Sequence, residues 1–268
     1  MKRALAVVTA ATLTVLAGTS PAQAAPKDPL AALRKQLVAG RGVTYTENSS
    51  AMEGNKPFYQ RKGLLQYGKS GIVASDLTSR FNFKKDPDAE KPSKEEAVKQ
   101  AIAEVPERTI RIGTTSYTSG YMIGARMPKG KSWWKQSPGW VSGNSAIFGA
   151  FVNAAEPATL KALLENGTRN GSTYEGEITV KELLRASAWT RAALYWGMEE
   201  EMPVSWTLTV DRNGLPQHLT AKVGSALNVA DIRYTGWGAK VSVKAPPAAK
   251  VTTKLTGSGK PLPRGPKN

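Results

Sequence analysis

The sequence predicts an α+β fold in which a few helices cover an antiparallel sheet. Residues 206–215 alternate apolar and polar side chains and then reach Asn213-Gly214, a pair typical of a tight β-hairpin turn. Residues 231–247 follow as a strand leading to a Trp-Gly pair and a short alternating strand that Pro246-Pro247 stops. Because strands joined by such short turns pair antiparallel, the C-terminal third of the chain indicates an antiparallel sheet.

The first elements along the chain are predicted to be a short helix and three strands. Asp28 fits the cap and Pro29 the first turn of a helix that ends at residues 40–42. Strands are expected over residues 43–48, 58–67 and 71–83. In the last of these, Val73, Leu77, Phe81 and Phe83 keep even spacing, which gives the strand one apolar face.

The middle of the chain alternates between helices and short strands. Ser93 and Glu96 form a capping box for a helix over residues 93–105. Strands are expected next, over residues 108–113, 115–119 and 121–127, followed by a segment with paired tryptophans over residues 129–140.

A second set of helices is predicted before the hairpin. Residues 157–166 form a helix closed by Gly167, and residues 173–179 form a strand. Thr179 and Glu182 then cap another helix, in which apolar residues keep helical spacing through Tyr195.

The N-terminus has the pattern of an export signal. Lys2 and Arg3 precede an uncharged apolar run from residue 4 to 17, and residues 22–24 read Ala-Gln-Ala, the small-residue pattern of a cleavage site. We therefore expect residues 1–24 to be a cleaved signal peptide, residues 25–250 a single domain and residues 251–268 a disordered basic tail. Thr19 stands where a bacterial lipidation signal would need cysteine, so we expect a soluble, secreted or extracytoplasmic protein without a lipid anchor.

The chain is strongly basic, with a net charge of +16 that falls to about +14 once the signal is removed. Such a surface attracts anionic membranes or cell-wall polymers, although a soluble charged surface without a dedicated partner explains it equally well. The absence of cysteine excludes disulfides and thiolate metal ligation. The protein therefore depends on its hydrophobic core alone, and we expect a monomer.

Catalytic and metal-binding patterns are weak throughout. His218 is the one histidine, so a multi-histidine metal site is excluded. It is expected on the polar face of its strand, where a role as a general base is not expected. The consecutive carboxylates of Glu199, Glu200 and Glu201 point in different directions, so they do not form the facing pair of a glycoside hydrolase. No phosphate-binding glycine loop occurs. We expect no enzyme activity, no catalytic residue, no metal and no cofactor.

The tryptophans and the apolar strand faces lead to a binding hypothesis. Trp133 and Trp134 alternate with lysines as in a groove for single-stranded nucleic acid, but inward packing of Trp134 is the better interpretation, and no nucleic-acid partner is expected. Trp206 shares its apolar face with Leu208. A curved sheet capped by helices can enclose an apolar cavity that takes a ligand. Alternatively, the side chains of the protein itself can fill this space.

In their order along the chain, several segments resemble the LolA-like superfamily, in particular its actinobacterial branch with the LppX and LprG lipoproteins. They are residues 63–68, residues 121–127 with the following Gly-Lys-Ser-Trp-Trp-Lys, residues 173–178, the hairpin at residues 210–216 and the closing residues 234–247. The resemblance implies a strongly curved antiparallel β-sheet, an unclosed half-barrel, with helices packed on its concave side. It also implies a cavity for acyl chains and no catalytic residues.

These inferences combine into one function and one alternative. We expect a secreted, non-catalytic carrier or sensor of a lipid or other hydrophobic ligand in the bacterial envelope. The alternative is an envelope protein whose basic surface binds anionic wall polymer, with no ligand in a cavity. The residues expected to line the cavity are Leu65, Phe81, Met122, Met127, Trp134, Trp206 and Leu208.

Overall fold

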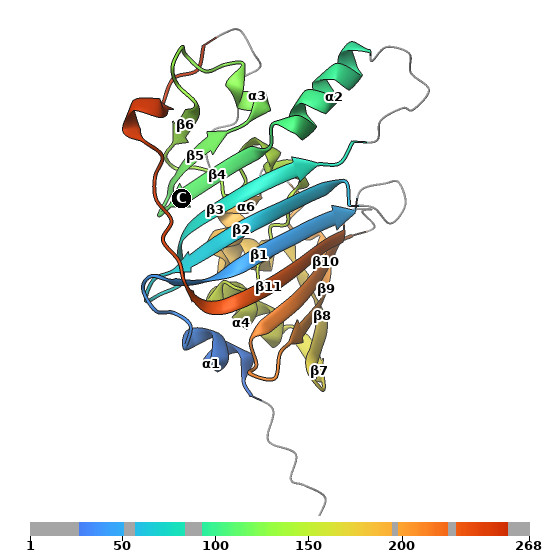
Figure 1. The fold of residues 1–268 in the computed structure, drawn as a ribbon. Helices are drawn as coiled ribbons and strands as arrows, with labels where there is room; N and C mark the ends of the chain where they lie inside the picture. Colours follow the sequence, from blue (N-terminus) through green and yellow to red (C-terminus); the bar gives the residue numbers. More distant parts are fainter. Residues whose placement is uncertain (1–26, 51–56, 84–92, 195–197, 225–228, 257–268) are drawn as a thin grey trace, which may run out of the picture.

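The computed structural model describes residues 27–50, 57–83, 93–194, 198–224 and 229–256. The segment that we interpret as a signal peptide therefore lies outside the described residues. Within them the chain forms an open sheet of twelve strands with a few helices, which confirms the predicted α+β class. The sheet curves around the helices, and its two edge strands do not meet (Figure 1).

The first half of the chain forms one meander. It contains α1 (Pro29–Arg34), β1 (Arg41–Ser50), β2 (Tyr59–Tyr67), β3 (Ile72–Phe81), α2 (Lys94–Glu104), β4 (Glu107–Ile112), β5 (Thr115–Ser119), α3 (Tyr121–Gly124) and β6 (Trp133–Gln136). The strands β1 to β6 lie side by side in sequence order, each antiparallel to the next.

The second half forms another meander. After the 3-10 turn η1 (Gly143–Phe148) come α4 (Pro157–Glu165), β7 (Gly167–Asn170), β8 (Thr173–Thr179), α5 (Val180–Ala186), α6 (Ala188–Ala193), β9 (Pro203–Val210), β10 (Pro216–Val223) and β11 (Val229–Lys240). The strands β7 to β11 are again neighbours in sequence order. The two meanders join where β11 pairs antiparallel with β1, from Arg41 opposite Lys240 to Ser50 opposite Val229.

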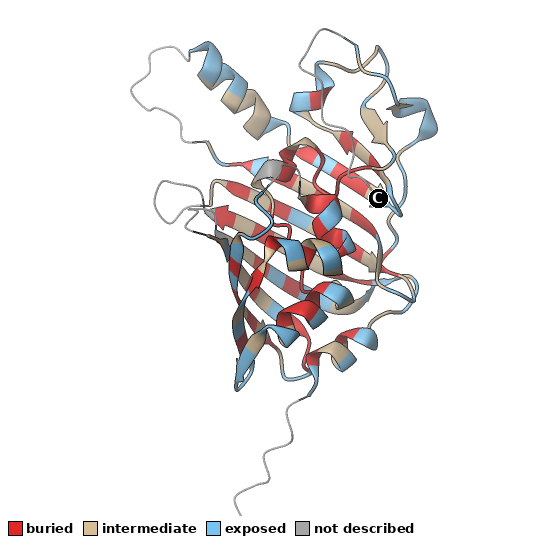
Figure 2. Cartoon of the chain, turned by 180° about the vertical axis from the view of Figure 1, so that it is seen from behind, coloured by how far each residue is buried: buried red, intermediate tan, exposed pale blue. Residues whose placement is uncertain are grey.

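This strand order forces the chain to cross the sheet once. The order is β12-β6-β5-β4-β3-β2-β1-β11-β10-β9-β8-β7, so β6 and β7 lie toward opposite edges. Residues 137–166 connect these two strands and contain η1 and α4. They therefore pass over one face of the sheet. Figure 2 shows this segment and the helices in front of the sheet, with the buried residues concentrated between the two layers. We call residues 137–156 the crossing segment.

Local sequence signals account for most of the element boundaries. Asp28 caps α1, and Ser93 and Thr179 each complete a capping box with the glutamate three residues later, as predicted. In the β9–β10 hairpin, Asp211 Oδ1 accepts hydrogen bonds from the backbone amides of Asn213 and Leu215. On β9, Val204, Trp206, Leu208 and Val210 are all buried on one face, which confirms the predicted alternation.

Four predictions are wrong in detail. Residues 121–127 begin as the short helix α3, where Ile123 alone of its four residues is buried, and not as a strand. The helix predicted from Thr179 is interrupted at Ser187, which caps α6 by accepting a hydrogen bond from the Thr190 amide. The closing segment is one long strand, β11, after which residues 241–247 have no regular structure.

The fourth correction concerns the start of the tail. Residues 251–256, which we assigned to the disordered tail of residues 251–268, have described positions. They follow the 3-10 turn η2 (Ala248–Lys250), and β12 (Val251–Thr252) pairs in parallel with β6. This backbone pairing orders the first part of the segment that composition alone assigned to the tail.

Candidate functional site: the covered inner face

The inner face of the sheet is an apolar wall. Its buried side chains come from both meanders and meet those of the helices in a single cluster. Aromatic rings make up much of the wall: Tyr45 packs at 6.0 Å from both Tyr234 and Trp189, measured between ring centroids. These large side chains are mostly below a tenth exposed, so the space between sheet and helices is filled along most of its length.

The residues that we predicted to line a cavity divide into two groups. Leu65, Trp206 and Leu208 lie in the apolar wall, and all three are buried. Phe81 is also buried, in an aromatic group with Phe58, Tyr59 and Phe148.

The remaining three predicted residues lie outside this wall. Met122 is 46% exposed on α3, and Met127 and Trp134 are half-buried. The structure therefore brings Leu65 of β2 together with Trp206 and Leu208 of β9. It places Met122, Met127 and Trp134, which follow β5 in the chain, away from them. Residues 121–127, which contain Met122 and Met127, begin as the helix α3 and not as the predicted strand.

The crossing segment covers this wall, and an ion pair holds its centre. Glu47 of β1 and Arg61 of β2 are completely buried, and Arg61 Nε lies 2.8 Å from Glu47 Oε2. Together they bind the main chain of Ala150: Glu47 Oε1 accepts from its amide at 2.6 Å, and Arg61 Nη2 donates to its carbonyl at 3.1 Å. Tyr45 completes the group by donating to Glu47 Oε2 at 2.7 Å.

We call Glu47, Arg61 and Tyr45 the clamp. Its electrostatics favour the charged forms of Glu47 and Arg61. Burial alone lowers the pKa of Arg61, but the adjacent Glu47 carboxylate together with Tyr45 and Tyr59 outweighs burial, and the net pKa shift is upward. Burial and the nearby Glu47 charge also raise the pKa of Tyr45 well above its usual value, so its hydroxyl stays protonated. Gly149 lies directly against the guanidinium, since a Cβ there would approach Arg61 Nη1 to 2.9 Å. A side chain at position 149 would therefore push into the clamp.

A second buried carboxylate holds the beginning of η1. Glu107 of β4 accepts hydrogen bonds from the amides of Asn144 and Ser145, at 3.2 and 3.0 Å, and from the Ser145 hydroxyl at 2.8 Å. Burial raises the pKa of Glu107 to about 7, although these hydrogen bonds pull it downward. The hydroxyls of Tyr59 and Ser79 extend the group, because Tyr59 Oη lies within hydrogen-bond distance of both Ser79 and Ser145.

Tyrosine hydroxyls hold the last part of the crossing segment. Tyr234 of β11 donates to Asn153 Oδ1 at 3.0 Å and accepts from the Ala154 amide at 2.9 Å. Tyr67 of β2 donates to the Ala155 carbonyl at 3.0 Å. These contacts are side-chain to main-chain or side-chain to side-chain bonds and not the rungs of a strand ladder.

The segment ends at a third carboxylate, which ties it to α6. Glu156 accepts hydrogen bonds from the hydroxyls of Thr159 and Ser187, and from the amide of Trp189 at 3.0 Å. Glu156 thereby fixes the start of α4 against the start of α6. Thr190 adds one bond back to the segment, from its hydroxyl to the Phe151 carbonyl at 2.8 Å.

An apolar recess of about 60 Å³ opens beside the crossing segment. Phe148, Phe151 and Val152 form one side of it, and Val223 of β10 and Ala230 of β11 form the other. Met198, which is 37% exposed, lies at its rim. The recess is too small for an acyl chain, and it marks a place where the apolar wall approaches solvent.

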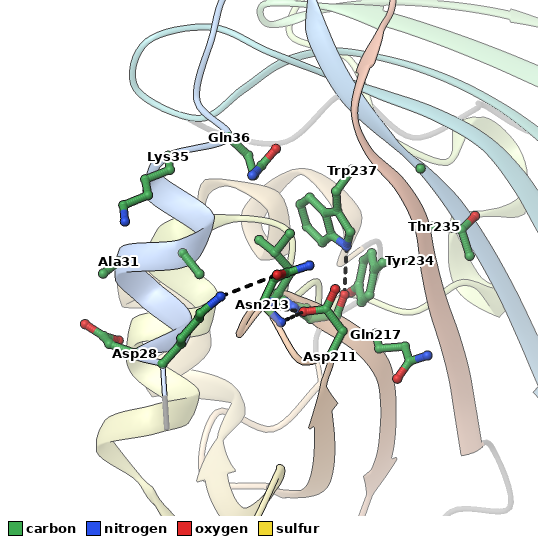
Figure 3. A pocket seen from close by; sticks show the side chains of 15 residues that line it. Asp28, Ala31, Lys35, Gln36, Asp211, Asn213, Gln217, Tyr234, Thr235 and Trp237 are labelled. Atoms are coloured by element: carbon green, nitrogen blue, oxygen red, sulfur yellow. Dashed lines mark hydrogen bonds between the residues drawn. The ribbon is translucent and has the colours of Figure 1, made fainter. Parts of the chain in front are cut away.

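A larger pocket on the surface has a different character. It has a volume of about 800 Å³ and lies between α1, the β9–β10 turn and β11 (Figure 3). Trp237 forms part of its wall; its ring stacks on Tyr67 and its Nε1 donates to the Pro216 carbonyl at 2.9 Å. The rest of the lining mixes charged and uncharged polar side chains with a few apolar ones, so this pocket does not offer a purely apolar environment; its charged residues are Lys27, Asp28, Lys35 and Asp211.

These arrangements hold the crossing segment in place. Each buried carboxylate described above accepts hydrogen bonds that fix main chain, and no cluster of three or more His, Asp or Glu within the described residues could hold a metal ion. His218 is half-buried and lies 3.0 Å from Asp231 Oδ2. Among the described helices, none has the length and apolar character needed to cross a membrane.

Sequence reasoning missed the residues of the clamp, although a signal for them exists. In β1, Glu47 has the same two-residue phase as Val43 and Tyr45, and in β2, Arg61 has the same phase as Tyr59 and Leu65. Alternation therefore assigns both charges to the inner face. Two opposite charges that face the core on neighbouring strands would be expected to pair.

Comparison with known proteins yields solved structures alone. No protein-family model and no curated protein matches the chain. LprF from Mycobacterium bovis is 11% identical at a TM-score of 0.36, over 81% of this chain and 95% of LprF. The lipoprotein LppX from Mycobacterium tuberculosis is 11% identical at a TM-score of 0.38, over 81% of this chain and 98% of LppX.

A LolA superfamily protein from Nitrosomonas europaea is 11% identical at a TM-score of 0.35, over 82% of this chain and 93% of that protein. LppX and the LolA superfamily are also the names that the sequence resemblance gave. Because each TM-score lies below 0.5, these similarities carry no argument about ligand or activity.

Replacing Arg61 with Met should destabilise the fold by about 3–5 kcal/mol, because Glu47 is then buried without its partner. The double variant Arg61→Met, Glu47→Gln should recover a large part of this loss, since no uncompensated charge remains. Urea unfolding of the wild type, both single variants and the double variant gives the coupling energy. Equal stability of the single and double variants would contradict the clamp.

Glu107 should make the folded state less stable as pH rises. Its pKa is about 7 in the folded chain and near 4.5 when exposed, so the folded state holds the proton over this range while the unfolded state has lost it. The free energy of unfolding contributed by Glu107 is therefore highest below pH 4.5 and decreases between about pH 4.5 and 7, by roughly 1–3 kcal/mol. In Glu107→Gln this part of the pH dependence should be absent, as measured by urea unfolding at each pH; an unchanged slope would contradict the assignment.

Proposed function

We propose that this protein is a non-catalytic carrier or sensor that binds a lipid or other hydrophobic ligand on the inner face of its sheet. The observation that carries the proposal is that the crossing segment, which belongs to no strand, covers an apolar, aromatic wall together with the helices. Gly149, Ala150, Ala154 and Ala155 contribute little apolar surface of their own, and the segment packs into the buried cluster mainly through Val141, Phe151 and Val152.

The way in which the segment is attached supports its displacement by a ligand. Its central part is fixed through a few side chains, chiefly Arg61, Glu47, Tyr234 and Tyr67, and belongs to no strand. Releasing these bonds would uncover the wall without breaking any strand pairing of the sheet. A ligand that buries apolar surface there gains roughly 25 cal/mol for each Å² removed from water, which offsets the lost bonds.

The recess beside Phe148 and Phe151 supports a direction of entry. The apolar wall comes close to solvent at this point, between the crossing segment and the ends of β10 and β11. An acyl chain that enters here would extend along the wall as the segment moves away. The activity would take place in the bacterial envelope, outside the cytoplasm. The signal-like residues 1–24 would direct the chain there, and the protein would be soluble.

Protein purified from its natural host should carry the ligand. Native mass spectrometry before and after organic extraction, followed by identification of the extract, measures this directly. The expected result is an amphiphile with a long apolar part in a ratio of about one per chain. Protein that is free of any amphiphile and that also fails to bind added fatty acid would overturn the proposal.

Loosening the crossing segment should strengthen ligand binding. Tyr234→Phe removes the two bonds to Asn153 and Ala154, so less free energy is needed to displace the segment. We expect the apparent Kd for a fluorescent fatty acid to fall about thirtyfold, since each of the two lost bonds contributes roughly 1 kcal/mol. Tyr174→Phe, on β8 and away from the segment, is the matched control and should leave Kd unchanged. An equal or weaker affinity in Tyr234→Phe would argue against displacement.

A further inference from the structure

Two long stretches of the chain contain no acidic residue. Residues 108–155 and residues 232–268 lack Asp and Glu entirely, although both contain several Lys and Arg. The acidic residues of the protein are therefore confined to the remaining parts of the sequence. An uneven distribution of this kind becomes a surface property if the fold brings the two stretches together.

The fold does bring them together at one end of the sheet. β12 pairs with β6, the Ser132 amide donates to the Lys250 carbonyl at 3.0 Å, and the Thr256 amide donates to the Arg126 carbonyl at 2.8 Å. Figure 1 shows β5, β6, α3 and the red segment of residues 248–256 gathered at this end. Residues that are far apart in sequence thus form one continuous acid-free region.

Lysines are concentrated on this region. A recess of about 530 Å³ lies between β5, β6 and the C-terminal segment, and Tyr117, Lys131, Lys135 and Lys254 line it. Further exposed lysines precede and follow these elements. We call the group the lysine surface, and its members are Lys129, Lys131, Lys135, Lys244, Lys250 and Lys254. On the neighbouring α2, Glu95, Glu96 and Glu104 mark the limit of the acid-free region.

Exposed apolar side chains accompany the lysines. In α3, Ile123 is buried and anchors the helix, whereas Met122 is 46% and Tyr121 is 37% exposed. The fold itself gains nothing from a methionine in water at this position. Cations beside an exposed methionine and tyrosine are the combination found on surfaces that contact lipid bilayers.

We propose that the lysine surface and α3 bind an anionic phospholipid bilayer. The ammonium groups would lie at the level of the lipid phosphates, and Met122 and Tyr121 would enter the boundary between headgroups and acyl chains. A soluble anionic polymer would use the lysines equally well but would gain nothing from Met122, so the apolar side chains favour the bilayer. This inference does not depend on a ligand inside the protein.

The test compares two triple variants of the mature chain in their binding to vesicles of phosphatidylglycerol and phosphatidylcholine. Lys129, Lys250 and Lys254 are exposed, and changing all three to Glu should weaken vesicle binding at least about a hundredfold, because each lysine near the surface contributes about fivefold. The matched control changes three exposed cations on α1 and the β9–β10 hairpin, Lys35, Arg212 and Lys222, to Glu. It makes the same change in net charge and should weaken binding much less.

A second measurement separates the bilayer from a polymer. Met122→Ser should weaken binding to the same vesicles about threefold or more and leave binding to soluble poly(glycerol phosphate) unchanged. Binding should also decrease steeply with added salt in the wild type. Equal losses in the two triple variants would overturn the proposal, because attraction would then follow net charge alone. Undiminished vesicle binding by Met122→Ser, with equally strong binding to the polymer, would overturn it in favour of a polymer partner.

Discussion

The order of the strands imposes the constraint on which the rest of the structure depends. Because β6 and β7 lie toward opposite edges of the sheet, the chain between them must cross the inner face. A crossing main chain brings polar amides and carbonyls into an apolar interior, and each of these groups needs a hydrogen-bond partner there. The buried charges of Glu47, Arg61 and Glu107 are therefore a consequence of the topology, and they satisfy main-chain groups that no strand can reach.

The same constraint relates the interior to binding. A sheet with a wholly apolar inner face would hold a crossing segment only through side-chain packing. Here the segment is attached at separate points along its length: at η1 by Glu107, at Ala150 by the Glu47–Arg61 clamp and at Ala154 by Tyr234. Discrete points of attachment can be released one after another, whereas a packed helix leaves as a unit. The lysine surface lies at the other end of this sheet from the β9–β10 hairpin, so the inner wall and the proposed bilayer contact are separate features.

Much of the fold could be predicted from the sequence, and most of the interior could not. The capping boxes at Ser93 and Thr179 and the alternation in β9 are local signals, and they gave the correct elements. The residues of α3 were predicted to form a strand, and four residues are too few to show a helical period. The lining residues Leu65, Trp206 and Leu208 lie in the wall because phase alone determines the face of a strand. The clamp was missed because a charge in a strand is ordinarily assigned to solvent, and its partner lies on another strand.

The pairing of β1 with β11 has a consequence for the way the protein acquires its structure. One of the first strands of the chain completes its hydrogen bonds with the last long strand, from Arg41 opposite Lys240 onward. The two meanders can each form from local contacts, but the sheet becomes continuous only when nearly the whole chain is present. Contacts between such distant residues slow folding. A chain that emerges gradually during synthesis would therefore remain two unjoined halves until β11 is complete.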